Sequence, residues 1–432
     1  MLSIILIGVL LGYHLALVLG GTGLVFGYLL WGNTVFQLLY QRFYALLLVY
    51  AFLAVPLFVY MGVMLERSGV AAKLYDAIYL WLGGLRGGLA LTTVIIGTIL
   101  AACVGIIGAS VTMLSIVALP AMMKRGYDRS LACGSICAGG TLGILIPPSV
   151  MLVTYGPMAE VSVGRLFMGA IVPGLLLSAL YCSYIAIRSL IQPQVAPAVP
   201  PEERRVPFIR KTTLLIKAVL PTAAIILSVL GSIFFGLAPP TEAGAVGAFA
   251  ATLLAIAYRK FDFFTLKDSI LKTTHLTAMI VLIAAMSFSF VGVFMSAGCG
   301  KVITNLMLNA PGGRWGVFAV IMFIIFILGF IIDWIGIVFI MVPLLVPVIP
   351  ALGFDPLWFG IMLCVNLQMS FMTPPLAGAL FFLKASADPK YGITMAEIIK
   401  GVIPFIALIM VCLVLCIFFP QIITWLPNMM IK

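Results

Sequence analysis

Two proline pairs stand inside long apolar segments of the 432-residue chain, at Pro147-Pro148 and Pro374-Pro375. Proline lacks a backbone N–H and clashes with the preceding turn, so a helix must break at each pair. Unpaired backbone groups inside a membrane are costly unless another group satisfies them. A cation is a natural partner for freed carbonyls, and an anion for the N–H groups that begin the next half-helix. A single pair would more often be a simple kink, but two copies favour ion-binding breaks.

Asp333 lies alone between Ile332 and Trp334 in another apolar stretch. A carboxylate at membrane depth is costly and is by default a functional-site hypothesis. Coordinating Na⁺ or carrying a proton would each offset that cost, and a solvated hairpin tip is the structural alternative. The sequence leaves these readings open.

Hydroxyl and amide side chains cluster near the breaks and near two glycine-rich spots. They are Ser110, Thr112, Thr141, Ser149, Asn366, Ser370 and Thr373. A lone Ser or Thr in a membrane helix usually bonds a carbonyl of its own helix or a neighbouring helix. Only the clustering makes these residues ligand candidates, and Ser110 and Thr373 are the strongest.

The composition places the chain in a membrane. Hydrophobic residues make up 64% of it and charged residues only 9%, whereas soluble domains are about one quarter charged. The net charge of +11 comes from basic residues in short loops between apolar segments. In membrane proteins, Lys and Arg in such loops indicate which side of the membrane is cytoplasmic. The sequence therefore predicts no nucleic-acid binding.

Two further functional classes are disfavoured by residue usage. The chain has eight cysteines without a C-x-x-C pair, which are expected to be buried apolar residues. It has only two histidines, no H-E-x-x-H motif and no carboxylate pair within one segment. These absences argue against a membrane protease, and we expect the protein not to be an enzyme.

Apolar segments of about 20 residues can cross a bilayer as helices. Nine such crossings are predicted, at 2–30, 45–64, 128–156, 165–187, 214–235, 240–258, 270–295, 356–383 and 398–419. The first contains Gly20-Gly21, where it is expected to bend or split. The predicted fold class is an all-α polytopic membrane protein.

Two more apolar regions, 89–123 and 316–349, are too long for one helix and are interrupted midway by glycine-rich spots. We predict that both are re-entrant helical hairpins, which enter and leave the membrane on the same side. With the N-terminus cytoplasmic, this assignment places most Lys and Arg residues inside, as the positive-inside rule requires. No basic residue precedes Arg42, so the first segment is not a cleavable signal peptide.

The two halves of the chain carry matching marks at one constant separation. These marks are Pro120 and Pro347, Gly126 and Gly353, Asp128 and Asp355, and the two proline pairs. Five crossings lie between the hairpins, and an odd number turns the second copy upside down. An inverted repeat is typical of secondary transporters, whose site lies near the midplane between the halves.

At the two repeat cores the resemblance to a known family becomes specific. Residues 105–156 (GIIGAS…GILIPPS) and 329–384 (GFIIDWIG…SFMTPPLAG) resemble the two halves of the large membrane subunit of TRAP (tripartite ATP-independent periplasmic) transporters. The resemblance implies an elevator-type, Na⁺-coupled importer in a bacterial or archaeal cytoplasmic (inner) membrane. It also implies two partners: a small four-helix membrane subunit and a periplasmic substrate-binding protein that delivers a small organic acid.

The resemblance also implies a ligand set. One Na⁺ would lie between the first hairpin tip and the first break, with ligands from Gly108, Ser110 and the backbone over Gly143–Pro147. A second Na⁺ would lie between Asp333, Gly336 and the backbone at Met372, Thr373 and Pro374, with Thr373 also contributing. The substrate would lie between the tips, with Ser110, Ser149, Asn366 and Ser370 as its candidate ligands.

The chain departs from the family pattern at two places. The family often has Ser-Gly-Ser where this chain has Gly108-Ala109-Ser110, and glycines where it has Ser370 and Ala377. Both departures bear on the ligand set rather than the fold. The variant Leu367–Phe371 resembles the subgroup that transports 2-oxo acids, lactate and similar monocarboxylates.

The predicted division of the chain follows the repeats. Residues 1–88 and 165–295 are scaffold helices, with a cytoplasmic linker over 192–213. Residues 89–164 and 296–384 are the two repeat cores, and 385–432 form a C-terminal helix. Three alternative functions are kept open: a stand-alone Na⁺/carboxylate symporter, a proton-coupled carrier and, least favoured, a channel or ion-pump subunit.

Overall fold

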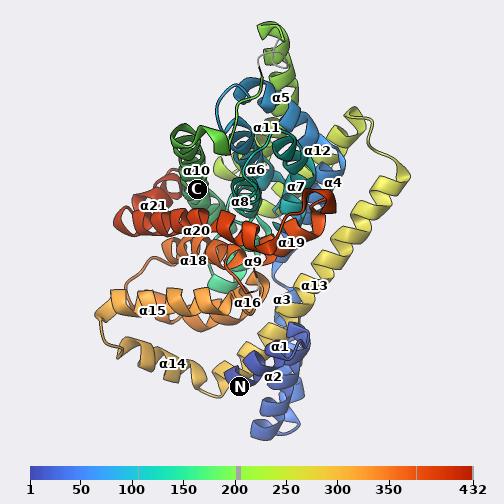
Figure 1. Cartoon of the computed structure of the whole chain (residues 1–432). Helices are drawn as coiled ribbons and strands as arrows, with labels where there is room; N and C mark the ends of the chain where they lie inside the picture. Colours follow the sequence, from blue (N-terminus) through green and yellow to red (C-terminus); the bar gives the residue numbers. More distant parts are fainter. Residues whose placement is uncertain (106, 201–205, 376, 431–432) are drawn as a thin grey trace.

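The structure is a computed structural model that describes residues 1–105, 107–200, 206–375 and 377–430 (Figure 1). These residues form helices and connecting loops, with no β-strand among them. Seven of the helical segments are long and apolar enough to cross a membrane: Tyr50–Arg67, Ile107–Lys124, Val163–Ile191, Phe208–Phe234, Pro240–Ala257, Phe263–Ser296 and Met395–Phe418. The predicted all-helical, polytopic character is therefore confirmed.

The elements of the first half follow the chain from the N-terminus to α10. They are α1 (Leu2–Leu10), α2 (Leu15–Trp31), α3 (Thr34–Leu47), η1 (Tyr50–Leu53), α4 (Ala54–Arg67), α5 (Val70–Leu82), α6 (Gly88–Val104), α7 (Ile107–Lys124), α8 (Arg129–Thr141), η2 (Leu142–Ile144), α9 (Val150–Ala159) and α10 (Val163–Ile191).

The elements of the second half follow α10. Its elements are η3 (Pro193–Val195), α11 (Phe208–Phe234), α12 (Pro240–Ala257), α13 (Phe263–Ser296), α14 (Cys299–Leu308), α15 (Gly313–Leu328), α16 (Trp334–Leu345), α17 (Val348–Ala351), α18 (Pro356–Met372), α19 (Gly378–Ser386), η5 (Pro389–Tyr391), α20 (Met395–Phe418) and α21 (Gln421–Asn428).

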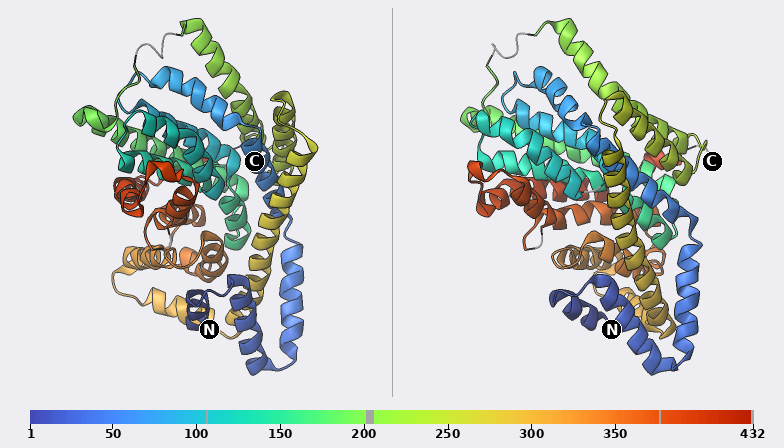
Figure 2. Two further views of the ribbon diagram at one scale, coloured as in Figure 1. Left: turned by 45° about the vertical axis from the view of Figure 1, so that its right-hand side comes forward. Right: turned by 90° about the vertical axis from the view of Figure 1, so that its right-hand side faces the viewer.

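Helix α13 is the long element that joins the two ends of the molecule. It runs along one side in Figure 1 and in the left view of Figure 2, crosses the front in the right view of Figure 2, and packs against α2, α3 and α4. It also contacts α14 and α16, and α16 belongs to the second predicted hairpin. A second group of helices, α6, α7, α8, α18, α19 and α20, packs together beside it. The site described below lies where these two groups meet.

Both long apolar regions are interrupted as the sequence predicts. The first is divided into α6 and α7 after Gly105, which has φ +63°, a conformation that glycine adopts readily. The second is divided into α15 and α16 between Gly329 and Asp333. Both proline-pair segments are also broken, and both Pro-Pro bonds are cis.

Close helix packing depends on glycines that face backbone. A Cβ at Gly97 of α6 would lie 2.6 Å from the carbonyl oxygen of Gly139 in α8. Gly134 of α8 and Gly401 of α20 approach each other in the same way, each against the other helix's backbone. Small residues allow membrane helices to approach at backbone distance, where van der Waals packing replaces the hydrophobic effect.

Prolines inside or after helices leave the carbonyl four residues earlier without its helical N–H partner. Pro221, Pro343 and Pro420 each have this effect. The carbonyls they free accept bonds from side chains of other helices: Lys217 from Tyr258 Oη at 3.4 Å, Phe339 from Ser287 Oγ at 2.5 Å, and Cys416 from Trp358 Nε1 at 3.1 Å. These bonds satisfy backbone carbonyls that lipid could not satisfy, because lipid tails offer no hydrogen-bond donor.

The two halves have the same local geometry at matching positions. Gly126 and Gly353 have φ of +72° and +74°. Asp128 and Asp355 cap α8 and α18 by accepting the backbone N–H of Leu131 and Leu357 at 2.9 and 2.7 Å. These matches support an internal repeat, while the inverted orientation of the second copy and the five-part division of the chain stay predictions.

Several elements differ from the sequence-based expectation. Segment 2–30 is two helices that separate at residues 11–14, whereas Gly20-Gly21 lies inside α2. Helix α21 lies within the C-terminal helix predicted over 385–432, whereas α3, α5 and α14 were not predicted. Each mixes polar residues with apolar ones, so a search for uninterrupted apolar runs passes over them.

The predicted linker over 192–213 is shorter than expected because α11 already begins at Phe208. Its first part is held against the first repeat core. Asp128 N–H donates to the Val195 carbonyl at 2.8 Å, and Gly87 N–H donates to the Ala196 carbonyl at 3.0 Å. Arg204 and Arg205, assigned to the cytoplasmic side, lie outside the described residues.

We expect Gly134→Ala to destabilise the protein by about 1–3 kcal/mol, because its Cβ would overlap the Gly401 carbonyl. Gly231→Ala in α11 is the matched control, since a Cβ there meets no atom within 4 Å. The control should keep or slightly raise the melting temperature, because alanine favours helix by about 1 kcal/mol. Melting can be followed in detergent with a dye that reacts with the buried cysteines. Equal melting temperatures for the two variants would contradict this account of the packing.

Candidate functional site

The first break lies between α8 and α9. After Thr141 the chain passes through the short helix η2, and α9 then begins at Val150. Ser149 is buried and its hydroxyl donates to the Ile144 carbonyl at 2.5 Å, which closes the break on itself. The hydroxyl of Thr141 donates to the Ala138 carbonyl at 3.0 Å.

The second break lies between α18 and α19. Thr373 takes an extended conformation after Met372, and its hydroxyl donates to the Met369 carbonyl at 2.7 Å. The two breaks are neighbours, because Thr141 Oγ1 lies 3.9 Å from the sulfur of Met372. The chain thus brings both interrupted helices together at their broken ends.

The tip of the first interrupted region lies against the first break. A Cβ at Gly105 would lie 3.5 Å from both the carbonyl oxygen of Pro148 and the backbone N of Val150. One turn into α7, Ser110 is buried and its hydroxyl has no hydrogen-bond partner among the described residues. A buried hydroxyl without a partner is costly, so Ser110 has the character expected of a ligand residue.

The tip of the second interrupted region carries Asp333. It occupies the N-cap position of α16, where its carbonyl accepts the first helical bond, from the Ile337 N–H at 3.2 Å. Its side chain is exposed although its neighbours Ile332 and Ile335 are buried. A carboxylate at this position is stabilised by the helix dipole.

One cavity of about 280 Å³ joins the two tips. Its lining residues come from both interrupted regions, from both breaks, and from helices α4 and α13. They are Val59, Gly105, Ile107, Gly108, Val150, Leu276, Met279, Ile280, Asp333, Trp334, Ile335, Phe371, Gly378 and Phe382.

Four helices begin at the wall of this cavity. Ile107, Val150, Trp334 and Gly378, the first residues of α7, α9, α16 and α19, all line it. The first N–H groups of a helix have no partner within the helix and carry partial positive charge. Asp333 is the sole charged side chain among the described lining residues. The cavity therefore offers backbone donors for an anion and one carboxylate for a cation.

A cation at this site would depend on oxygen atoms from different segments. The described residues contain no group of three or more His, Cys, Asp or Glu placed to hold a metal ion. The candidate ligands are Asp333, hydroxyls such as that of Ser110, and backbone carbonyls at the breaks. Oxygen ligands of this kind suit hard cations rather than thiolate- or imidazole-seeking transition metals.

The predicted site residues occupy three kinds of position. Gly108 and Asp333 line the cavity. Ser110, Thr373 and the backbone at Gly143, Pro147, Met372 and Pro374 lie within or next to the tips and breaks around it. Gly336 packs instead against Leu15 of α2. Asn366 and Ser370 face α15, donating to the Met322 carbonyl at 2.8 Å and the Phe326 carbonyl at 3.3 Å.

Sequence reasoning missed most of the cavity wall. Phe371 and Gly378 flank the second proline pair and could have been suggested by that position. Phe382 and the α13 residues Leu276 and Met279 carry no signal in the sequence that separates them from other apolar residues. Their place in the wall follows from how the helices pack.

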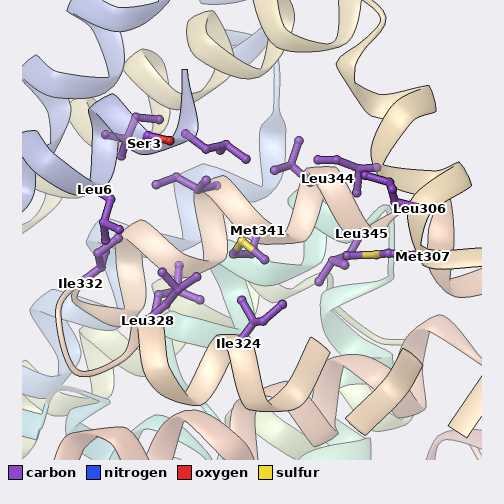
Figure 3. A pocket seen from close by; sticks show the side chains of 15 residues that line it. Ser3, Leu6, Leu306, Met307, Ile324, Leu328, Ile332, Met341, Leu344 and Leu345 are labelled. Carbon is purple, nitrogen blue, oxygen red and sulfur yellow. The ribbon is translucent and has the colours of Figure 1, made fainter. Parts of the chain in front are cut away.

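A larger cavity of about 430 Å³ lies elsewhere, between α1, α14, α15 and α16 (Figure 3). Its walls include Leu6, Leu328 and Met341, which point into it, and among the described lining residues Ser3 alone has a polar side chain. The described residues around this space therefore offer a solute anion one hydroxyl and no charged partner. The smaller cavity between the tips is therefore the candidate site.

Comparison with known proteins places the chain among transporters. The family described as "Tripartite ATP-independent periplasmic transporter, DctM component" matches residues 1–422. The C4-dicarboxylate TRAP transporter large permease protein of Pseudomonas aeruginosa is 31% identical over 380 residues, which cover 88% of this chain and 86% of that protein. Its counterpart in Vibrio cholerae is 29% identical over 459 residues, covering 100% and 97%.

A solved structure is also similar. The YdaH transporter of Alcanivorax borkumensis matches with a TM-score of 0.65 over 91% of this chain and 90% of that one. The sequence identity is 14%, so this likeness concerns the fold alone.

The position of Asn366 leads to a prediction. Because its amide bonds α15 in this structure, Asn366→Ala should lower the free energy of unfolding by about 1 kcal/mol. Asn305→Ala, on the exposed side of α14, is the control and should change stability little. Thermal melting with and without a bound solute measures both effects. If Asn366→Ala leaves the melting temperature unchanged but abolishes solute-induced stabilisation, a ligand role would replace the structural one.

Proposed function

The chain belongs to the DctM component family of tripartite ATP-independent periplasmic transporters, and on this basis we propose that it imports a small organic acid in symport with Na⁺. The acid would occupy the cavity between the tips of the two interrupted regions. The observation that carries this proposal is the meeting of four helix starts and one carboxylate in a single cavity. Half-helix ends of this kind bind substrate anions and coupling cations in secondary transporters.

The coupling ion is assigned from the oxygen atoms near the tips. One Na⁺ would use the partnerless hydroxyl of Ser110 with backbone carbonyls of the first break. A second would use Asp333 and carbonyls near Thr373. One cation would give the buried Ser110 hydroxyl a partner, and the other would neutralise the Asp333 carboxylate. The bound solute and the ions would then stabilise each other by charge.

The position of the cavity favours an elevator mechanism. One wall comes from Val59 of α4 and from α13, and the other walls come from the two tips and breaks. Sliding of the repeat cores along α4 and α13 would carry the solute from one membrane face to the other. The wall from α4 and α13 would stay behind, so the solute would become exposed on the opposite side.

The partners follow from the tripartite family. We propose that a periplasmic substrate-binding protein delivers the acid and that a small four-helix membrane subunit supports the scaffold. The complex would lie in the cytoplasmic (inner) membrane with the N-terminus of this chain on the cytoplasmic side. A stand-alone symporter would instead transport without either partner, which reconstitution can decide.

We expect Asp333→Asn to reduce solute accumulation to the level of protein-free liposomes, because the amide cannot neutralise a bound cation. The measurement is uptake into proteoliposomes that contain the chain and its membrane partner, with the binding protein outside and a Na⁺ gradient imposed. Asp262→Asn is the matched control: Asp262 caps α13 from an exposed position, and asparagine also caps helices well. Full accumulation by Asp333→Asn would remove this carboxylate from the mechanism.

Replacing the Na⁺ gradient by a K⁺ gradient should abolish uptake by the unmodified chain, since the oxygen sites are assigned to Na⁺. A pH gradient is imposed in a parallel sample without Na⁺. Accumulation driven by that pH gradient alone would identify the protein as a proton-coupled carrier instead.

A further inference from the structure

We propose that the cavity selects monocarboxylates with an apolar substituent over dicarboxylates, and that Phe382 is a specificity-determining residue. This inference rests on the proposed function, because it takes the cavity between the tips as the solute site. It goes further by naming the chemical class of the solute from the walls of that cavity.

The walls away from the helix starts are apolar. Three aromatic rings, those of Trp334, Phe371 and Phe382, line the cavity, and α13 contributes Leu276, Met279 and Ile280. A carboxylate bound at the helix starts would direct the rest of the molecule toward these side chains. An apolar substituent would gain free energy there through burial, at roughly 25 cal/mol per Å² removed from water.

A second carboxylate would meet the opposite conditions. The described lining residues include no Lys, Arg or His, and their sole charge is the negative one of Asp333. A second anionic group would therefore lie against apolar walls without a charged partner. Burying an unpaired charge is strongly unfavourable.

The size of the cavity sets a limit on the substituent. Its volume of about 280 Å³ lies just below the range of roughly 300–1,000 Å³ for small-molecule sites. A short aliphatic or single-ring substituent fits this space. The site therefore favours small monocarboxylates.

Phe382 is placed to contact such a substituent. Its ring lies against the first tip, because a Cβ at Gly108 would approach the Phe382 ring to 2.9 Å. Its exposed fraction of 45% is nearly the same as the 50% of the adjacent Phe381, but only Phe382 lines the cavity. The two neighbours therefore form a matched pair for mutation.

The inference separates this chain from two of its relatives. The similar proteins of Pseudomonas aeruginosa and Vibrio cholerae are named as C4-dicarboxylate permeases. At 31% and 29% identity, membership of the same family does not show that these proteins transport the same solute. The charge and polarity of this cavity point to a different acid.

The test compares two acids of nearly the same shape, 4-methylpentanoate and butanedioate, which differ by an isopropyl group in place of a carboxylate. Binding of each to the full chain in nanodiscs, with its membrane partner and saturating Na⁺, is measured by titration calorimetry. We expect 4-methylpentanoate to bind at least about tenfold more tightly, as apolar-pocket selectivity typically allows. Equal or tighter binding of butanedioate would overturn this inference while leaving organic-acid transport in place.

Variants locate the selectivity in the wall. Phe382→Ala should weaken 4-methylpentanoate binding about tenfold, since it removes apolar contact area, and Phe381→Ala should not change it. Met279→Lys places a cation in the α13 wall and should raise the affinity for butanedioate relative to 4-methylpentanoate. Equal effects of the two phenylalanine variants, or no shift with Met279→Lys, would contradict the assigned wall. If the unmodified chain binds neither acid in a Na⁺-dependent manner, the proposed function fails as well.

Discussion

The structure depends on one constraint, which is that backbone polar groups inside a bilayer must find partners. Most of the chain meets it by forming helices. Where prolines remove a helical bond, side chains from other helices supply it, as Ser287 does for Phe339 and Trp358 for Cys416. At the breaks beside the two proline pairs, Ser149 and Thr373 donate to the Ile144 and Met369 carbonyls, and the ions and solute proposed above would be further partners.

The same constraint explains why the site has both a positive and a negative character. Each helix that stops inside the molecule leaves carbonyls at its end, and each helix that restarts presents N–H groups. Four restarts reach one cavity, while Asp333 supplies the single carboxylate beside them. A cation near Asp333 and an anion at the helix starts would each lower the cost of binding the other. Coupling of ion and solute then follows from ordinary electrostatics.

Much of this arrangement could be predicted from the sequence because its causes are local. The proline pairs, Gly105 and Asp333 act within one or two turns, and the structure has breaks at all of them. Contacts that depend on packing could not be predicted in this way. Asn366 and Ser370 were chosen as polar residues near a break, but the sequence does not reveal that they face α15. The amphipathic helices α5 and α14 were missed because their apolar residues are not continuous.

The cavity lies between helices α4 and α13 on one side and the two repeat cores on the other. This position explains how one cavity can combine a backbone end of fixed geometry with an apolar end made of side chains. The polar end is made of backbone at tips and breaks, whose geometry is fixed by proline and glycine. The apolar end is made of side chains such as Phe382 and Met279, which meet across the cavity. Substitution of these side chains would change the wall without altering the backbone that is proposed to bind the ions. Under the proposed function, a change of solute would therefore require only new side chains in this wall, while the groups proposed to bind the ions stay as they are.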